Sequence, residues 1–390
     1  MNLKAIKFSR FSGQPYEWSI EGKPENNVYN QWVTFENINL IVGKNATGKS
    51  KTINALRQLA DLLADNVKLS ELVYKTSTYD LLFDDNGIEI AYFLDFQDGK
   101  IKQEILTVDS KEVLKRDDKQ GIMFYQKAGT MLDFQMENDK LAASRVDTIQ
   151  QPFFETLHNW GKTLTHYRFG GELGKNYFLH EINQNKEIEI NLKDTNQVVG
   201  IFVQGKQEFG DIFTTKIFED MKKINYHIDK IGIGSLNTFP ETLFGLGVQE
   251  QDIDVMTNQT EMSQGMFRAL SLLIQLNYSL LIKTPNCILI DDIGEGLDYE
   301  RSKSLIDLII EKVENSAVQI IMTTNDRFVM NKIPLEYWSV IHRVPKKSLF
   351  YNYRNSKDVF DEFKYTGLSN FDFLSSEFYF EDLEKQGEQL

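Results

Sequence analysis

Cysteine is almost absent from this sequence, since Cys287 is the single one in 390 residues. One thiol cannot form a disulfide within the chain, which excludes a disulfide-stabilised scaffold and favours a reducing compartment. The chain also lacks any apolar run near the roughly 20 residues of a membrane span, and its N-terminus lacks the apolar core of a signal peptide. We therefore expect a cytoplasmic protein that has no membrane partner.

Positive charge is in deficit, because 43 lysines and arginines oppose 57 aspartates and glutamates, giving a net charge of −14. This acidity argues against coating of nucleic acid or of an anionic membrane as the main role, but leaves open a local basic groove formed on dimerisation. Proline is scarce, with seven residues, and the chain has no heptad repeat, low-complexity tract or internal repeat. The length and the 41% of hydrophobic residues indicate two or three globular domains.

One motif carries phosphate-binding chemistry: residues 43–50 read GKNATGKS, which fits the P-loop pattern G-x-x-x-x-G-K-[ST]. It follows an apolar strand pattern at 38–42 and precedes apolar residues at the helical spacing 53, 56, 60 and 63. In such a loop, backbone N–H groups and a helix N-terminus bind the phosphates of ATP. The alternative is an ordinary glycine-containing turn. The predicted nucleotide-binding residues are Gly43, Lys44, Asn45, Ala46, Thr47, Gly48, Lys49, Ser50 and Lys51.

The remaining patterns predict strands around this motif and a mixed region after it. Alternating residues predict strands at 3–8, 16–20 and 32–42, a hairpin of 88–96 with 101–108, and strands at 121–126 and 131–136. A helix is expected at 148–163. Between about 170 and 225 we expect short strands at 188–192 and 198–203, followed by an amphipathic helix at 213–224.

Past residue 225, two buried strand patterns end in polar side chains. Residues 287–292 end in Asp291 and Asp292, and residues 318–325 end in Asn325, with a helix pattern at 301–313 between them. Strand, helix and strand in this order predict a parallel sheet whose ligands lie at the carboxyl ends, together with Gly43. Asp291 and Ser50 would hold Mg²⁺, and Asp292 would orient or deprotonate water. The alternative for the two carboxylates is a capping or turn role.

The order of these motifs resembles the ABC-type ATPase heads of the SMC, RecF and OLD (overcoming lysogenization defect) families. GKNATGKS is similar to their GKNGSGKS loop, and Asp291 with Asp292 to their Walker B pair. Residues 296–298 resemble the D-loop, and Asn325 occupies the place of the switch histidine. The signature motif is matched by Ser263, Gln264 and Gly265, although Ser263 as a simple helix N-cap is the alternative. Gln150 and Gln151 are the candidates for the Q-loop glutamine.

The resemblance implies an α/β fold: an ABC-type P-loop ATPase head with a mixed β-sheet, an antiparallel β subdomain and a helical or mixed insertion. We place the P-loop lobe with its antiparallel subdomain at 1–147, the insertion at 148–225, the signature and Walker B lobe at 226–350 and a tail at 351–390. It further implies an ATP-dependent homodimer, or a higher homo-oligomer, in which each P-loop faces the partner's signature motif.

Two departures from the family concern catalysis. The family's base is usually glutamate, but Asp292 is one C–C bond shorter. Its switch histidine is replaced by Asn325, which cannot accept and hold a proton at neutral pH. With Lys49 on the phosphates and Glu295 as a fallback carboxylate, we expect slow or partner-dependent ATP hydrolysis.

Our leading interpretation is a regulatory ATPase of the kind found in OLD-type and Septu-type phage defence, whose nuclease-like effector is a separate chain. The alternatives are a RecF-like ATPase that binds DNA, a non-catalytic scaffold held together by ATP, and a transporter subunit. The acidic, aromatic tail after residue 351 is expected to pack on the head, with docking of a partner as the alternative.

Overall fold

In the computed structural model, the described residues are 1–25, 29, 31–180, 191, 193–236, 243–283, 287–314 and 316–380. They form two compact units. Unit 1 comprises Met1–Leu164 with Pro334–Leu390, and unit 2 comprises Thr165–Ile333. The finer boundaries at 147/148, 225/226 and 350/351 stay predictions.

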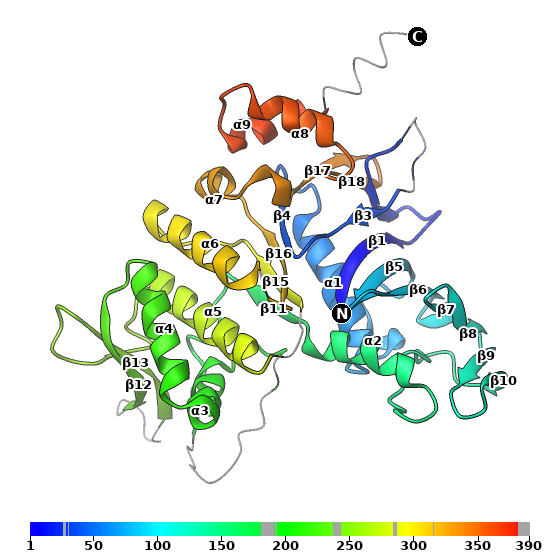
Figure 1. Cartoon of the computed structure of the whole chain (residues 1–390), viewed down its shortest axis with the longest axis horizontal. Helices are drawn as coiled ribbons and strands as arrows, with labels where there is room; N and C mark the ends of the chain where they lie inside the picture. Colours follow the sequence, from blue (N-terminus) through cyan, green and yellow to red (C-terminus); the bar gives the residue numbers. More distant parts are fainter. Residues whose placement is uncertain are drawn as a thin grey trace. The chain divides into compact units, whose positions relative to one another are not determined.

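Unit 1 is built on a mixed sheet whose strands follow the order β10-β9-β8-β7-β6-β5-β1-β2-β18-β17-β4 (Figure 1). Strands β17 and β4 are parallel, as are β18 and β2, and the pairs from β10 to β2 are antiparallel. The sequence missed β5 and β8, which complete the antiparallel region. The strands are β1 (Asn2–Arg10), β2 (Trp18–Gly22), β3 (Val33–Thr34, paired with β1), β4 (Ile38–Val42), β5 (Ser77–Asp85), β6 (Ile88–Gln97), β7 (Lys100–Val108), β8 (Lys111–Asp117), β9 (Gln120–Tyr125), β10 (Thr130–Gln135), β17 (Trp338–Val344) and β18 (Lys347–Asn352).

Two helices of unit 1 pack closely against each other. Helix α1 (Lys49–Leu63) follows the P-loop, and α2 (Pro152–Thr163) crosses it at Gly161, where a Cβ would come within 2.6 Å of the Ala60 carbonyl oxygen. Helix α2 starts four residues later than the predicted helix because Pro152, at its first position, lacks the N–H that an earlier turn would use. Trp160 of α2 then packs edge-on against Phe83 of β5.

The C-terminal segment packs on unit 1 as far as it is described. It contains α8 (Lys357–Lys364) and α9 (Asn370–Ser375), whose buried face includes Phe360, Phe363 and Phe373. The Phe380 ring stacks on His342 of β17 with ring centroids 4.4 Å apart, and the Tyr379 hydroxyl lies 3.2 Å from the His342 ring nitrogen. The expectation that residues after 351 pack on the head is therefore confirmed up to residue 380.

Unit 2 contains a parallel sheet in the order β16-β15-β11 and a small antiparallel sheet in the order β12-β13-β14. The mixed sheet and the antiparallel strands expected in residues 1–147 are confirmed in unit 1, whereas the small sheet of β12, β13 and β14 was not predicted. The elements of this unit are β11 (Thr165–Arg168), α3 (Val198–Phe209), α4 (Asp211–Lys223), β12 (Ile228–Leu236), β13 (Leu243–Glu250), β14 (Thr257–Asn258), α5 (Gln264–Leu281), β15 (Cys287–Asp291), α6 (Tyr299–Val313), β16 (Gln319–Thr323) and α7 (Arg327–Lys332).

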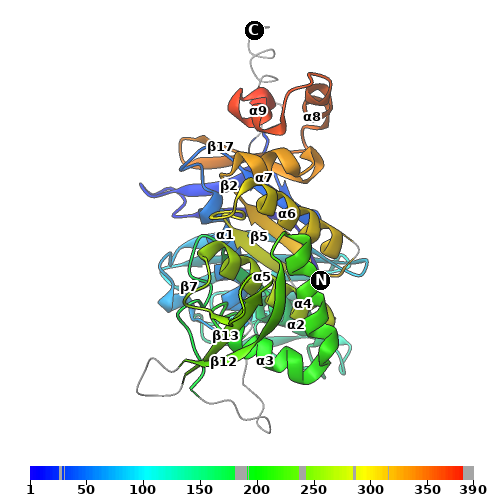
Figure 2. The same ribbon diagram turned by 90° about the vertical axis from the view of Figure 1, so that its left-hand side faces the viewer.

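The strand predicted at 198–203 is wrong, because these residues begin α3. Their β-branched side chains favour a strand locally, but the apolar run continues to Phe209 and packs against α4 and α5 (Figure 2). Gly205 allows this packing, since a Cβ there would come within 2.6 Å of the Phe213 ring. Of the strand predicted at 188–192, only residue 191 is among the described residues.

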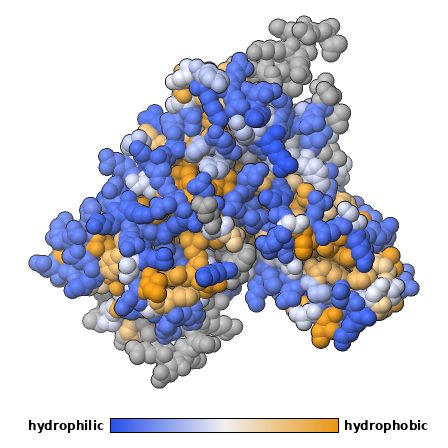
Figure 3. Space-filling model, in the orientation of Figure 1, coloured by the Kyte–Doolittle hydropathy of each residue, from blue (hydrophilic) through white to orange (hydrophobic). Residues whose placement is uncertain are grey.

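The outer surface is mostly hydrophilic on the face in Figure 3, with apolar residues in small groups. Among the described helices, none combines the length and the apolar character needed to cross a lipid bilayer.

Candidate functional site

The P-loop lies between β4 and α1, where the sequence placed it. Its tight turn uses two residues in the left-handed region, Ala46 at φ 64° and Gly48 at φ 120°. The Lys49 ammonium turns back onto the loop and donates to the carbonyl oxygens of Gly43 at 2.6 Å and Lys44 at 3.2 Å. Gly48 is also the N-cap of α1 and has no side chain to cap it. This arrangement is suited to an anion at the helix N-terminus.

Strand β18 supports the P-loop from behind. The Ser348 hydroxyl donates to the Thr47 carbonyl oxygen at 2.6 Å and accepts from the Trp18 indole N–H at 3.0 Å. A Cβ on Gly48 would come within 2.7 Å of the Ser348 oxygen, so that position requires glycine for space as well as for its φ. Arg343 of β17 donates to the Ala46 carbonyl oxygen at 3.0 Å.

Positive charge gathers beside the first turn of α1. Burial lowers the pKa of the Lys51 ammonium, and the charges of Arg10 and Arg343 lower it further. The Arg10 guanidinium lies over the Tyr74 ring at 3.9 Å. An anion at this side of the P-loop would meet an electropositive surface. These groups line a cavity of about 60 Å³ formed by Phe8, Arg10, Trp18, Lys51, Asn54, Ala55, Gln58 and Tyr74.

In unit 2, the two carboxylates and the amide predicted from the sequence lie together at the ends of β15 and β16. Asp291 accepts a 2.5 Å hydrogen bond from the Thr323 hydroxyl, which itself accepts from the Asp292 N–H at 3.0 Å. The Asn325 amide donates to the Asp292 carboxylate at 3.2 Å. Asp292 has a φ of 57°, a conformation that aspartate enters more readily than most residues.

The predicted signature motif begins helix α5. Ser263 is its N-cap and accepts from the Met266 N–H at 3.2 Å, so the capping interpretation of Ser263 describes a contact that exists. Gly265 lies against the D-loop, where a Cβ would come within 2.6 Å of the Gly296 carbonyl oxygen. The Gln264 amide donates to the Glu172 carboxylate at 3.4 Å. Gly265 thus couples the start of α5 to the D-loop.

A family model described as "AAA domain, putative AbiEii toxin, Type IV TA system" (AAA_21) matches residues 38–331, which include the P-loop, the signature and both strand ends. The chain belongs to the AAA_21 family. Its fold is that of an ABC-type, SMC-like ATPase head, as the sequence predicted.

Solved structures of SMC heads resemble this AAA_21 chain. An SMC head bound to the C-terminal winged-helix domain of ScpA shares 14% identity over 90% of this chain and 97% of that one, with a TM-score of 0.50. The SMC head from Thermotoga maritima shares 13% identity over 90% of this chain and 99% of that one. An SMC head with an extended coiled coil, bound to the C-terminal domain of ScpA from Pyrococcus furiosus, shares 14% identity over 93% of this chain and 99% of that one. Both have TM-scores of 0.44. No curated protein sequence matches the chain.

A buried arginine ties the AAA_21 signature helix to two loops. Arg268 donates to the carbonyl oxygens of Gly170 at 2.6 Å, Gly171 at 3.0 Å and Glu295 at 3.0 Å. The Glu295 carboxylate lies directly against Gly170, where it would clash with any Cβ. Its role as a fallback base stays a prediction, and its side chain is directed toward the loop after β11.

The donors at the strand ends suit Mg²⁺. Among the described residues, no group of three or more histidine, cysteine, aspartate or glutamate side chains could hold a metal on its own. Magnesium in nucleotide sites uses one or two protein oxygens, together with phosphates and water. Asp291, a carboxylate at a strand end, fits this requirement, and Ser50 is the second predicted ligand.

The Q-loop candidates Gln150 and Gln151 belong to unit 1, and their assignment stays a prediction. Gln151 is buried as the N-cap of α2 in unit 1, and Gln150 precedes it. Arg168, which ends β11 in register with Asp291, is not among the site residues predicted from the sequence. A four-residue strand with a buried tyrosine gives little signal, although its arginine is followed by two glycines that mark a loop.

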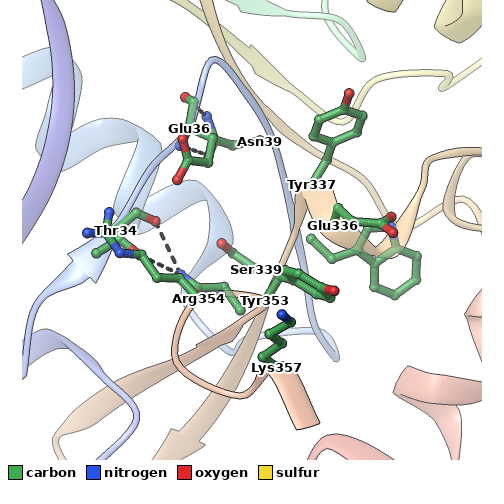
Figure 4. Close-up of a pocket in the computed structure, with 11 residues that line it drawn as sticks. Thr34, Glu36, Asn39, Glu336, Tyr337, Ser339, Tyr353, Arg354 and Lys357 are labelled. Atoms are coloured by element: carbon green, nitrogen blue, oxygen red, sulfur yellow. Dashed lines mark hydrogen bonds between the residues drawn. The ribbon is translucent and has the colours of Figure 1, made fainter. Parts of the chain in front are cut away.

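A separate cavity of about 430 Å³ lies at the opposite end of β4 and β17 from the P-loop (Figure 4). The residues at its wall include Asn39 near the start of β4, Ser339 in β17, and the cations Arg354 and Lys357. Asn39 exchanges hydrogen bonds with the Glu36 backbone at 2.8 and 2.7 Å, which fixes this wall. Because it is at the amino ends of the strands, this cavity is distinct from the phosphate-binding loop.

Proposed function

We propose that this chain is an ATPase that binds ATP with Mg²⁺, dimerises on ATP and controls a separate effector protein. The observation that carries this proposal is the pair of carboxylates at the end of β15, hydrogen-bonded to Thr323 and Asn325 at the end of β16, in a chain whose P-loop has the required strand-loop-helix setting. Membership of the AAA_21 family supports ATP binding and hydrolysis.

In this proposal the P-loop amides and Lys49 bind the triphosphate, and Asp291 with Ser50 holds Mg²⁺, which neutralises phosphate charge. Asp292 accepts a proton from a water molecule. The water oxygen then forms a bond to the γ-phosphorus, the bond to the β–γ bridging oxygen breaks, and that oxygen leaves with ADP. Asn325 orients Asp292 through its amide hydrogen bond of 3.2 Å.

The same amide contact supports slow turnover. The hydrogen bond from Asn325 engages a carboxylate oxygen of Asp292, and that oxygen is then less available to orient water. Because Asp292 also has the shorter side chain, we propose hydrolysis that is slow or accelerated by a partner. A non-catalytic scaffold held by ATP is the second candidate, and the same Asp292–Asn325 contact favours it.

The dimer is proposed from the signature motif. Ser263 and the N-terminus of α5 would bind the γ-phosphate held by the P-loop of a second copy. The family description names a putative toxin of a TA system, which supports action on another macromolecule and, we propose, a role in anti-phage defence with a nuclease-like effector. An SMC head bound to ScpA is a relative in fold that binds a protein partner.

Two variants test this function. Lys49→Ala should abolish ATP binding and ATP-dependent dimerisation. Asp292→Asn should keep both, because asparagine also tolerates a φ of 57°, and should remove phosphate release. Equilibrium binding, light scattering and phosphate release, each with and without Mg²⁺, measure these steps. ATP binding that survives in Lys49→Ala would refute the proposal, and ATP-dependent wild-type dimers without phosphate release would select the scaffold.

A further inference from the structure

Arg168 occupies a defined place at the carboxyl edge of the parallel sheet in unit 2. It is the last residue of β11 and lies in register with Asp291 of β15, while Tyr167 is in register with Ile290. The Phe169 N–H donates to the Asp291 carbonyl oxygen at 2.9 Å, which extends this pairing by one bond. Adjacent strands are about 4.8 Å apart, so Arg168 begins one strand away from the predicted metal ligand.

Strand alternation places Arg168 and Asp291 on the same face. The Tyr167 hydroxyl donates to Gln275 of α5 at 2.9 Å, so Tyr167 points toward α5 and Arg168 points to the opposite face. Residues in register on parallel strands point to the same face of the sheet. The side chains of Asp291 and Arg168 therefore lie on the same face. Thr323, which bonds to Asp291 at 2.5 Å, belongs to the same group.

The Arg168 charge is uncommitted, unlike the charges of Arg268 and Arg301. Its side chain is exposed, and it has no hydrogen bond or ion pair with any residue in the described part of the chain. Arg268 uses its guanidinium on three carbonyl oxygens, and Arg301 pairs with Asp298 at 2.5 Å. An arginine in register with Asp291 that pairs with neither Asp291 nor Asp292 is available to an anion from outside the unit.

The backbone that carries Arg168 is held on both sides. The Gly171 N–H donates to the Arg168 carbonyl oxygen at 2.8 Å, closing a tight turn directly after the strand. Arg268 then fixes the carbonyl oxygens of Gly170 and Gly171 from the first turns of α5. The backbone next to Arg168 is therefore held by α5, the helix that Ser263 caps.

We propose that Arg168 is a further catalytic residue of this ATPase, whose guanidinium binds the γ-phosphoryl oxygens of ATP at the Asp291 edge. As water adds to the γ-phosphorus and the bond to the bridging oxygen breaks, negative charge on these oxygens is neutralised by Arg168, and the proton of the water goes to Asp292. This inference rests on the proposed function. It also supplies positive charge to a site whose proposed base, Asp292, accepts a hydrogen bond from Asn325.

The test compares Arg168→Ala and Arg168→Lys with Arg354→Ala, a matched control at an exposed arginine of the distant cavity. The rate of single-turnover phosphate release should fall by at least about 100-fold in Arg168→Ala. This threshold is lower than the rate factors known for arginines that stabilise phosphoryl transfer. The Kd for a non-hydrolysable ATP analogue should change by less than about threefold, because the contact strengthens in the transition state. Arg168→Lys should recover part of the rate, since lysine keeps the charge but loses the planar fork.

Guanidinium ion added at millimolar concentration should raise the rate of Arg168→Ala and leave that of Arg354→Ala unchanged. The inference is overturned if Arg168→Ala keeps its rate within about twofold of the wild type while Lys49→Ala loses ATP binding, and the proposed function then stands. It is equally overturned if Arg168→Ala weakens analogue binding and leaves the rate of the bound complex unchanged. If the wild type releases no phosphate, hydrolysis and this inference fail together.

Discussion

At the scale of single residues, Ser348 connects the C-terminal part of unit 1 to the P-loop. It is fully buried and bonds to both Thr47 and Trp18. A serine 300 residues from the loop in sequence carries no motif, so only the strand pairing of β18 reveals its role. Removing its hydroxyl leaves the Trp18 N–H and the Thr47 carbonyl group without this partner.

We therefore predict that Ser348→Ala lowers the free energy of unfolding by about 1–3 kcal/mol, the cost of an unsatisfied buried group. ATP affinity should fall several-fold, because the back of the P-loop loses its support. Urea unfolding followed by tryptophan fluorescence measures the first effect, since the four tryptophans all lie in unit 1. Unchanged stability and unchanged affinity would show that the contact is dispensable.

Glu104 is the centre of a fully buried polar cluster in the antiparallel region. Its carboxylate accepts from Tyr92 at 3.0 Å, from the N–H groups of Ala142 and Ala143 at 2.9 Å, and from Arg116 at 3.4 Å. Both Glu104 and Arg116 have no exposed surface. Removal of either charge would leave the other buried and uncompensated.

Glu104→Ala should accordingly lower the free energy of unfolding by about 3–5 kcal/mol. The matched control is Glu137→Ala, which breaks the exposed ion pair with Lys119 and should change stability by less than about 1 kcal/mol. Urea unfolding measures the free energy of unfolding of both variants. Equal losses of stability in Glu104→Ala and Glu137→Ala would contradict this account.

At the scale of helices and strands, the sequence predicted those elements whose conformation depends on neighbouring residues in the chain. The strand-loop-helix from β4 to α1 was predicted because its glycines, lysine and apolar spacing all lie within 26 residues. Helix α3 was mistaken for a strand because Val198, Val199 and Ile201 favour extended structure locally, while burial against α4 and α5 stabilises a helix. Arg168 was missed because its position depends on pairing with a strand more than 100 residues later.

The C-terminal segment is an element whose docking should depend on pH. Phe380 stacks on His342 of β17 with ring centroids 4.4 Å apart, and the Tyr379 hydroxyl contacts the His342 ring nitrogen at 3.2 Å. Glu377 forms an ion pair with Lys44 of the P-loop. Burial lowers the pKa of His342, more than the charge of Glu377 raises it.

Because the pKa of His342 is lower in the docked state, the undocked state binds more protons, and docking weakens as the pH falls below about 6.5. We predict faster hydrogen exchange in α8 and α9 at pH 5.5 than at pH 7.5, after correction for intrinsic rates. His342→Gln should remove most of this difference. An identical pH dependence in His342→Gln and in the wild type would assign the effect to other groups.

At the scale of the whole molecule, the order of motifs predicted the ABC-type head, since P-loop, signature, Walker B strand and switch residue follow one another along the chain. The site chemistry was less predictable. Asp292 has a φ of 57°, in a region of backbone conformation that aspartate enters more readily than most residues. The residue pattern around Asp292 does not predict that backbone conformation.

The proposed dimer predicts that two inactive variants can complement each other. A complete site within one chain would not allow this. If each ATP needs the signature of a second copy, Asp292→Asn and Ser263→Arg damage different halves of the site. Each variant alone should release no phosphate. In a mixed dimer, the P-loop and Asp292 of the Ser263→Arg copy face the intact signature of the Asp292→Asn copy, so that one of its two sites is whole.

Mixing the two variants in equal amounts should therefore restore about a quarter of the wild-type rate, because half of the dimers are mixed and each has one active site. Phosphate release measured over a range of mixing ratios should peak at equal amounts, and the peak should vanish when Ser263→Arg also carries Lys49→Ala. A rate that equals the average of the two separate variants at every ratio would mean that each chain completes its own site, and Ser263 would then be only the cap of α5.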